Sequence, residues 1–294
     1  MFFETVFTLI KSGNSYLFLL PIYGALLLGE RIAHAVLRPQ ETWNNRESAT
    51  NIFITVVFLM LNMLMGHLLP LAVMAMLHAS LGITALPFGL SGWIAAFLLY
   101  DLAWYIDHRV AHRVGFFWAM HHVHHSCPEY DMTVASRGFW LDASMLSRPT
   151  FYLLPIFGVS PLHFMVVSIV TNVWGIAQHT RMVGRLPVLD WLFSTPSNHR
   201  VHHGVEPQYL DRNYGEVLMI WDHLFGTHQP EEEEPTYGVT TPINTSNPIR
   251  IELAGLLWLH AKVSTAAGAK QKLLCLMKPP EWTPNQRVSP STSG

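Results

Sequence analysis

Nine histidines are spaced in a way that suits a binding site for two metal ions. They form one HxxxH pair, two HxxHH triplets and a single residue between the triplets. Residues three or four apart share one face of a helix, so each cluster can point its imidazoles in one direction. Imidazole binds iron, zinc and copper well, and this number exceeds what one tetrahedral zinc ion needs. The candidate metal ligands are His108, His112, His121, His124, His125, His179, His199, His202 and His203.

The other histidines fit the pattern less well. On a helix, His122 lies about 100° away from the stripe formed by its neighbours, so we leave it out. His223 and His228 flank the WDHLFGTH segment, and we expect them close to the site or on the surface. The isolated histidines are interpreted as structural, and they are His34, His67, His78, His163 and His260.

Acidic residues could orient the imidazoles. Asp101, Tyr105, His108 and His112 are spaced by four, three and four residues, which predicts one continuous helical stripe. An ionisable residue inside an apolar helix usually faces a polar interior. We therefore expect Asp101 to accept a hydrogen bond from a ligand imidazole, and we assign Asp101 and Tyr105 to the catalytic site. The alternative partner of Asp101 is His67. Asp131, Asp211 and Asp222 are further candidates to bind ligand imidazoles.

The scarcity of charge predicts a membrane protein. Of 294 residues, 50% are apolar and only 13% are charged, about half the usual charged fraction of a soluble protein. No Asp, Glu, Lys or Arg occurs in residues 12–29, 48–100 or 149–180. A spanning helix needs about 20 apolar residues. We therefore predict an all-α, multi-pass membrane helical bundle, and the alternative is a soluble helical protein with a large core.

About four spanning elements can be placed. Three are helices, and the fourth is a hairpin broken by the Gly158–Pro161 turn. Pro70 predicts a kink in the second helix. The histidine clusters follow the ends of these elements, which predicts a cytoplasmic, histidine-rich helical cap. The expected spans are 16–34, 51–77, 92–112 and the hairpin 144–180, and the expected divisions are an N-terminal span and basic loop (1–48), a membrane-embedded catalytic domain (49–228) and a polar tail (229–294). In the tail we expect a solvated acidic run, Glu231–Glu234, and a possible surface helix over residues 249–277.

Basic residues predict the orientation. Arg31, Arg38 and Arg46 follow the first span, whereas the 81–91 turn has no basic residue, so the arginine-rich side should face the cytoplasm. The only two cysteines imply no disulfide framework, which agrees with that placement. A net charge of −2 and the lack of a phosphate-binding loop give no sign of a nucleic-acid partner. The opening segment has no basic region before its apolar residues, so we do not expect a cleaved signal peptide. The short tails favour a bacterial inner membrane.

The three clusters resemble those of the fatty acid hydroxylase/sterol desaturase superfamily of membrane di-iron oxygenases. They are HRVAH at 108–112, HHVHH at 121–125 and HRVHH at 199–203. The stretch TPSNHRVHHGVEPQYLDRNYGEVLMIWDHLFGT and the isolated His179 are most similar to the alkylglycerol monooxygenase branch. His223 departs from the more usual basic residue of this stretch. The resemblance spans roughly residues 50–285. It implies that the nine histidines bind two iron ions and that electrons come from a separate electron-transfer protein or a reduced pterin.

The resemblance also implies a reaction. It is O₂-dependent hydroxylation of a C–H bond in a membrane lipid such as a fatty acyl, sterol or alkyl-ether lipid. A desaturase or an ether-cleaving monooxygenase could use the same site. A non-enzymatic metal transporter or sensor is an alternative of another class, although transporters usually bind their ions near mid-membrane. The sequence does not indicate an oligomeric state. The residues expected to line a lipid channel are Trp104, Phe139, Trp140, Phe164 and Trp174.

Overall fold

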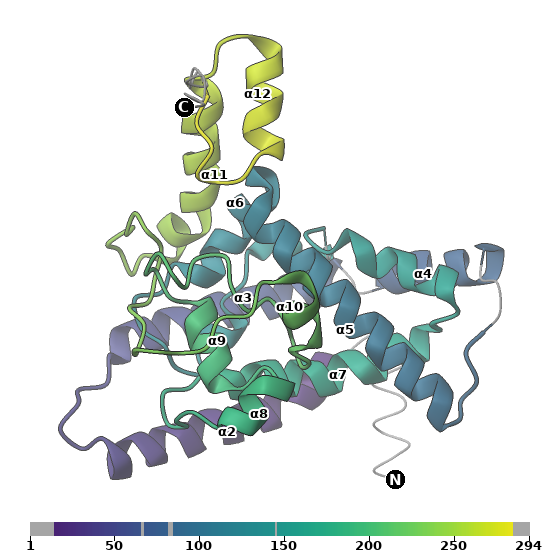
Figure 1. Cartoon of the computed structure of the whole chain (residues 1–294), viewed down its shortest axis with the longest axis horizontal. Coiled ribbons are helices and arrows are strands. Elements are labelled where there is room, and N and C mark those ends of the chain that lie inside the picture. The colour runs from purple at the N-terminus through teal and green to yellow at the C-terminus, as the bar shows by residue number, and fades with distance from the viewer. Residues whose placement is uncertain (1–14, 66–67, 82–84, 145, 285–294) are drawn as a thin grey trace, which may run out of the picture.

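The computed structural model describes residues 15–65, 68–81, 85–144 and 146–284, and it is all-helical over these ranges (Figure 1). Within them no strand forms, although Phe193–Leu218 and Gly204–Tyr237 are isolated antiparallel bridges. The all-α prediction is confirmed. The long helices are α2 (Ser15–Leu37), α3 (Asn45–Met65), α4 (Leu68–Leu81), α5 (Leu90–Arg113), α6 (Gly115–His125), α7 (Pro161–Gln178), α11 (Pro248–Ser264) and α12 (Gly268–Met277). The short helices are η1 (Val134–Ser136), η2 (Trp140–Ser144), η3 (Pro149–Phe157), α8 (Pro187–Leu192), α9 (Pro196–His202) and α10 (Ile220–Phe225).

Only the first predicted span passes a length and hydropathy test for membrane crossing within the described residues. That stretch is Leu19–Leu37, in α2. The predicted 51–77 span is divided between α3 and α4, and residues 66–67 between them lie outside the described ranges, as does the proposed partner His67. The predicted 92–112 helix is present as α5, whose 24 residues extend over about 36 Å. The four-span bundle therefore remains a prediction.

The predicted hairpin forms, but its two arms differ. The first arm is the 3₁₀ helix η3, and the second is the α-helix α7. Gly158 ends η3 in the left-handed conformation (φ 85°), which glycine adopts without steric cost. Ser160 then caps α7 by accepting a hydrogen bond from the backbone N–H of His163. The hairpin packs on α4 and α5 around buried Tyr100, Phe151, Leu154, Phe164 and Val167.

A second hairpin, α11 and α12, supports α6. In Figure 1 it projects from the other helices. Gly255 of α11 lies so close to α6 that an added Cβ would be 2.0 Å from the backbone oxygen of Ala119. Glycine is therefore required for this approach. The predicted single surface helix over 249–277 is in fact these two helices, separated by a turn at residues 265–267.

The chain after Arg181 includes two short helices, α8 and α10, that expose apolar side chains. Phe193 directly follows α8, and it forms an antiparallel bridge with Leu218, which lies just before α10. The backbone N–H of Met219 also donates to the carbonyl of Leu192 (3.1 Å). α10 packs on α5, where Phe225 stacks on Tyr105 with 5.3 Å between ring centroids. Both short helices expose large apolar side chains, namely Val188, Leu189, Trp191, Leu192, Ile220, Leu224 and Phe225. We call this set the α8–α10 surface.

Candidate metal centre

Four segments bring the nine predicted histidines together. The first pair lies near the end of α5, and the first triplet ends α6. Val114 is extended between them (φ −128°, ψ 115°), so the chain bends and the two helix ends face each other. His179 directly follows α7, and the second triplet lies on α9 and the residue after it. Seven of the nine are buried, and His121 and His124 are partly buried.

The imidazoles form two groups rather than three. In each group one nitrogen from every residue lies within 4.8 Å of the others. Each HxxHH triplet contributes to both groups, so its rings do not point at a single position as the helical face suggested. The first group is His108, His112, His121, His125 and His202, and the second is His124, His179, His199 and His203. His122 is buried beside Trp118 and belongs to neither group, in line with its exclusion.

The nitrogen spacing fits a shared cation in each group. The Nε2 atom of His125 is 3.1 Å from that of His112, of His121 and of His202. In the second group, Nε2 of His179 is 3.1 Å from that of His199 and 3.4 Å from that of His124. Nitrogens bound at about 2.1 Å to one ion lie about 3.0 to 3.4 Å apart.

Backbone carbonyls turn several of the rings toward the centre. Nδ1 of His108 lies 2.9 Å from the carbonyl oxygen of Tyr214. Nδ1 of His202 lies 2.9 Å from the carbonyl oxygen of Arg212, and Nδ1 of His179 lies 2.7 Å from that of Gly175. A carbonyl can only accept, so each Nδ1 carries the proton and each Nε2 offers a lone pair.

Two Nε2 atoms of the centre have no protein proton to accept. The Nε2 atoms of His108 and His203 are buried without any hydrogen-bond partner. Neutral rings that face each other through lone pairs repel unless a cation lies between them. The residues present therefore fit a pair of metal ions.

The surroundings keep the rings neutral. Burial, and next the neighbouring imidazoles, hold the pKa values of His121, His124, His125, His199 and His203 well below the usual range. Neutral imidazoles can bind a metal ion without first losing a proton.

One of the three predicted aspartates contacts a ligand candidate. Asp211 Oδ1 lies 3.6 Å from Nδ1 of His112, and Asp211 also binds Arg113. Burial alone would raise the pKa of Asp211, but His112 and Arg113 lower it to about 2. The predictions for the other two are wrong. Asp131 binds Thr133 and Ser48, whereas Asp222 accepts from Thr227 and from the backbone of residues 214 and 215.

The predicted hydrogen bond between Asp101 and a ligand imidazole is also wrong. Asp101 instead accepts from the backbone N–H groups of Val217 and Leu218 and from Nε1 of Trp221, at 3.0, 3.2 and 2.9 Å. It fixes the returning 214–222 segment against α5, and that segment supplies the Tyr214 carbonyl to His108. Tyr105 lies on the same stripe, but its hydroxyl pairs with Thr227 at 2.9 Å. Neither residue therefore binds a ligand imidazole in this structure, and their assignment to the catalytic site stays a prediction.

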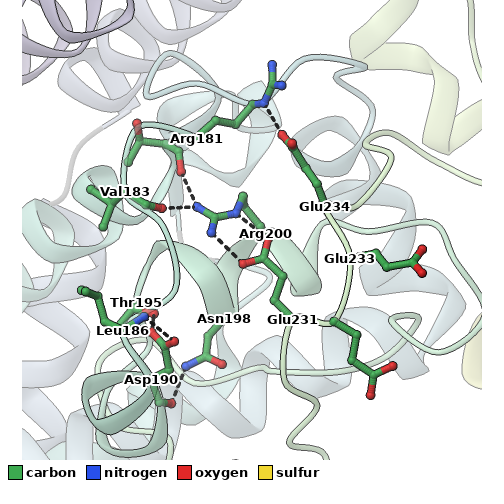
Figure 2. Close-up of polar contacts among 12 residues, drawn as sticks. Arg181, Val183, Leu186, Asp190, Thr195, Asn198, Arg200, Glu231, Glu233 and Glu234 are labelled. Carbon is green, nitrogen blue, oxygen red and sulfur yellow. Dashed lines mark hydrogen bonds and ion pairs between the residues drawn. The ribbon is translucent and has the colours of Figure 1, made fainter. Parts of the chain in front are cut away.

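An ion pair that the sequence did not suggest holds α9 in place (Figure 2). Arg200 is buried between two ligand candidates, and its guanidinium makes two 2.7 Å hydrogen bonds to the carboxylate of Glu231. The same guanidinium donates to the carbonyls of Thr180 and Val183, which follow His179. Glu231 is buried, so the prediction of a fully solvated acidic run is wrong at this position. Glu234 in the same run pairs with Arg181.

A cavity of about 280 Å³ opens onto the imidazoles. Five of the candidate ligands line it, and apolar side chains of α2, α3, α5 and α7 form much of the remaining wall. Trp104, Phe139 and Phe164 line it as predicted, whereas Trp140 and Trp174 are not in its wall. Their indole N–H groups bind the carbonyls of Ile54 and Ser194. Polar residues that the sequence did not single out for the channel also line it, including Asp107, Arg148 and Glu216.

Comparison with known proteins identifies the class of this all-helical protein with two imidazole groups beside an apolar cavity. Residues 93–227 match the fatty acid hydroxylase family model. The chain is 36% identical over 194 residues to alkylglycerol monooxygenase of Xenopus tropicalis, which is 66% of this chain and 43% of that protein. The human alkylglycerol monooxygenase is 34% identical with the same coverage. No solved structure matches.

A bacterial relative lies in the same family. The chain is 29% identical over 217 residues to an ornithine lipid hydroxylase of Rhizobium tropici, covering 68% of this chain and 64% of that one. The chain spans less than two thirds of the length of each of these relatives. It belongs to the fatty acid hydroxylase family. Named relatives include monooxygenases, a hydroxylase and a sterol desaturase.

Proposed function

We propose that this protein is an O₂-dependent di-iron hydroxylase that acts on a C–H bond of a membrane lipid. The observation that carries the proposal is the cavity, which brings apolar walls directly up to five of the nine imidazoles. A lipid tail in this space would place a C–H bond against the metal centre. The names of the relatives agree with oxidation of lipids.

The nine histidines would hold two iron ions, and iron at such a site supplies the capacity to reduce O₂ and attack an unactivated C–H bond. The residues of the chain contribute in other ways. The carbonyls of residues 175, 212 and 214 and the carboxylate of Asp211 orient four rings. Apolar side chains such as Leu19, Phe58 and Leu59 line the cavity and exclude water from the reacting carbon. Electrons would come from a separate protein or a reduced pterin.

Hydroxylation is the main proposal, and desaturation or cleavage of an ether lipid by the same site are its close variants. A sterol desaturase is among the relatives, and both reactions begin at a C–H bond next to the metals. The metal-transporter alternative has less support, because the described residues show no group of metal-ligand side chains spaced for an ion besides the two imidazole groups, and much of the cavity wall beyond the histidines is apolar.

The reaction can be tested by comparing lipids from cells that express the wild type, His124→Ala or His122→Gln. His124 belongs to the second imidazole group, whereas His122 is buried nearby but belongs to neither. We expect wild type and His122→Gln to produce the same new lipid, and His124→Ala to produce none. Mass spectrometry identifies the reaction by a gain of one oxygen, a loss of two hydrogens or a released aldehyde. Identical lipid profiles for wild type and His124→Ala, with iron bound to the wild type, would refute the proposal.

We also propose a multi-pass protein of the bacterial inner membrane with its metal centre near the cytoplasmic face. The α8–α10 surface is consistent with this placement. The segment that carries α10 is fixed to α5 at Asp101, which is 11 residues from the start of α5 and so about 16 Å along that helix. An apolar surface at that depth would lie within the inner leaflet rather than in water. Exposed apolar residues along α2 and α5, such as Leu28, Ile32, Ile94 and Leu98, also suit contact with lipid tails.

A spin label distinguishes these environments. Leu224 is 67% exposed on the α8–α10 surface, whereas Glu233 is an exposed residue of the acidic run, and both native cysteines are buried. In lipid nanodiscs we expect a label on Leu224→Cys to be reached by O₂ but shielded from a water-soluble nickel chelate. A label on Glu233→Cys should be reached by the chelate. Equal access of the chelate to the two labels would place the α8–α10 surface in water.

A further inference from the structure

The α11–α12 hairpin exposes an apolar stripe that takes no part in its packing on α6. Three or four residues separate successive turns of this stripe, so its side chains share one face of α11. We call it the α11 stripe, and it consists of Ile249, Leu253, Leu256 and Leu257. The buried face of the same helix carries Ile251, Gly255 and Leu259. Because α11 is apolar on both faces, its exposed face needs an apolar environment from outside the chain.

The charge at the surface of the hairpin is positive. The exposed charged side chains of residues 248–280 are all basic, namely Arg250, Lys270, Lys272 and Lys278. None of these four lies within 4.0 Å of a carboxylate in the described part of the chain. The carboxyl group of Glu252 is buried, whereas the whole chain has a net charge of −2. A helix surface that combines exposed apolar and basic side chains is typical of an element that lies on a membrane with anionic lipids.

The hairpin begins beside the first turns of α3. The hydroxyl of Thr50 on α3 lies 3.2 Å from the carbonyl oxygen of Ser246, just before α11. The exposed side chains of α3 are polar at its start, as at Arg46, and apolar further on, as at Phe53 and Val56. In a spanning helix such a change marks the boundary between headgroups and acyl chains. The hairpin therefore starts near this boundary, and in Figure 1 it extends to one side of α3 rather than continuing along it.

We propose that the α11–α12 hairpin lies in the headgroup layer of the cytoplasmic leaflet, with the α11 stripe against acyl chains and its basic side chains bound to anionic headgroups. The proposal rests on the membrane placement given above, but it does not depend on the hydroxylase reaction. Lipid suits this surface better than a second copy of the chain does. A symmetric pair would bring the same basic surface of the two copies together, and like charges repel across an interface.

A spin label on Leu257→Cys tests the contact with lipid. Leu257 is 60% exposed, and both native cysteines are buried. The labelled full chain is placed in nanodiscs of phosphatidylcholine, either alone or mixed with phosphatidylglycerol. In the anionic mixture we expect the label to be reached by O₂ but shielded from a water-soluble nickel chelate. In phosphatidylcholine alone the chelate should reach it several-fold more readily, whereas a label on Glu233→Cys should be open to the chelate in both.

The double variant Lys270→Gln/Lys272→Gln tests the role of charge. One basic side chain near an anionic surface strengthens membrane binding by roughly fivefold. In anionic nanodiscs the double variant should therefore give the Leu257 label the chelate access seen in phosphatidylcholine alone. Arg185→Gln is the matched control, because Arg185 is exposed but lies outside the hairpin, and it should leave the label shielded. A label on Leu253→Cys repeats the measurement if Leu257→Cys folds poorly.

Two results would overturn the proposal. One is equal access of the chelate to the Leu257 label with and without phosphatidylglycerol. The other is dipolar coupling between Leu257 labels on two chains in one nanodisc, because a second copy would then cover the α11 stripe. A label on Leu28→Cys, which is 63% exposed on α2, reports the membrane placement separately. If that label is shielded while the Leu257 label is open to the chelate, the placement stands and the hairpin proposal alone fails.

Discussion

His179→Ala should lose one of the two metal ions, whereas His108→Ala should keep both. The two imidazole groups are unequal, with five nitrogens in the group of His108 and four in the group of His179. Removing one ligand leaves four donors in the larger group but only three in the smaller one. Removing a residue that hydrogen-bonds a metal ligand typically lowers activity by roughly 10- to 100-fold. We expect a larger fall in activity for His179→Ala, because this variant loses a ligand itself. Metal content per chain, measured by elemental mass spectrometry after desalting, checks the prediction.

The control for this prediction is His122→Gln, because His122 is a buried neighbour outside both groups. This variant should retain both ions. Equal loss of metal from His108→Ala and His179→Ala would show that the division into five and four is wrong. Loss of metal from His122→Gln as well would mean that general damage to α6, rather than removal of a ligand, explains the result.

Much of the candidate centre follows from the sequence because the spacing within each cluster is local. Residues three or four apart meet on a helix whatever the rest of the fold does, and the outlying His122 could be excluded for the same reason. The division of each triplet between two ions could not be predicted. It depends on how α5, α6, α9 and the end of α7 approach one another, with His202 meeting His125 across 77 residues of chain.

The role of Asp101 shows the same limit. Its position on the stripe of α5 was predicted, but its partner was not. The segment that contains Val217 and Trp221 returns to α5 after more than 100 residues, and it takes both carboxylate oxygens. No local pattern encodes such a contact.

The fold was predictable where apolar runs are long and less so elsewhere. α2 and α7 occur largely where the absence of charge predicted them, and α5 begins in a charge-free segment but continues through Asp101 and Asp107. The α8–α10 surface was missed because each helix has only six residues, too few to reveal a periodic apolar face. The buried part of the acidic run was missed because four consecutive glutamates are usually solvated, and only the tertiary position of Arg200 gives Glu231 a partner.

Arg200→Met should destabilise the protein by roughly 3–5 kcal/mol, because it leaves the carboxylate of Glu231 buried without its partner. The two side chains are 6% and 7% exposed. The substitution also removes two hydrogen bonds that tie α9 to the carbonyls of Thr180 and Val183. We therefore expect weaker metal binding as well, since His199, His202 and His203 lose part of their support. Chemical denaturation of the metal-free protein, in one detergent, measures the first effect, and metal retention measures the second.

The matched control is Arg181→Met. Arg181 makes a 2.6 Å ion pair with Glu234, but these side chains are 28% and 49% exposed, so the loss should be at most about 1 kcal/mol. The double variant Arg200→Met/Glu231→Leu should recover much of the stability lost by Arg200→Met, since it leaves no unpaired buried charge. If the double variant is as unstable as the single one, the cost comes from the lost support of α9 rather than from the stranded carboxylate. If Arg200→Met is no worse than Arg181→Met, the pair does not hold the second triplet in place.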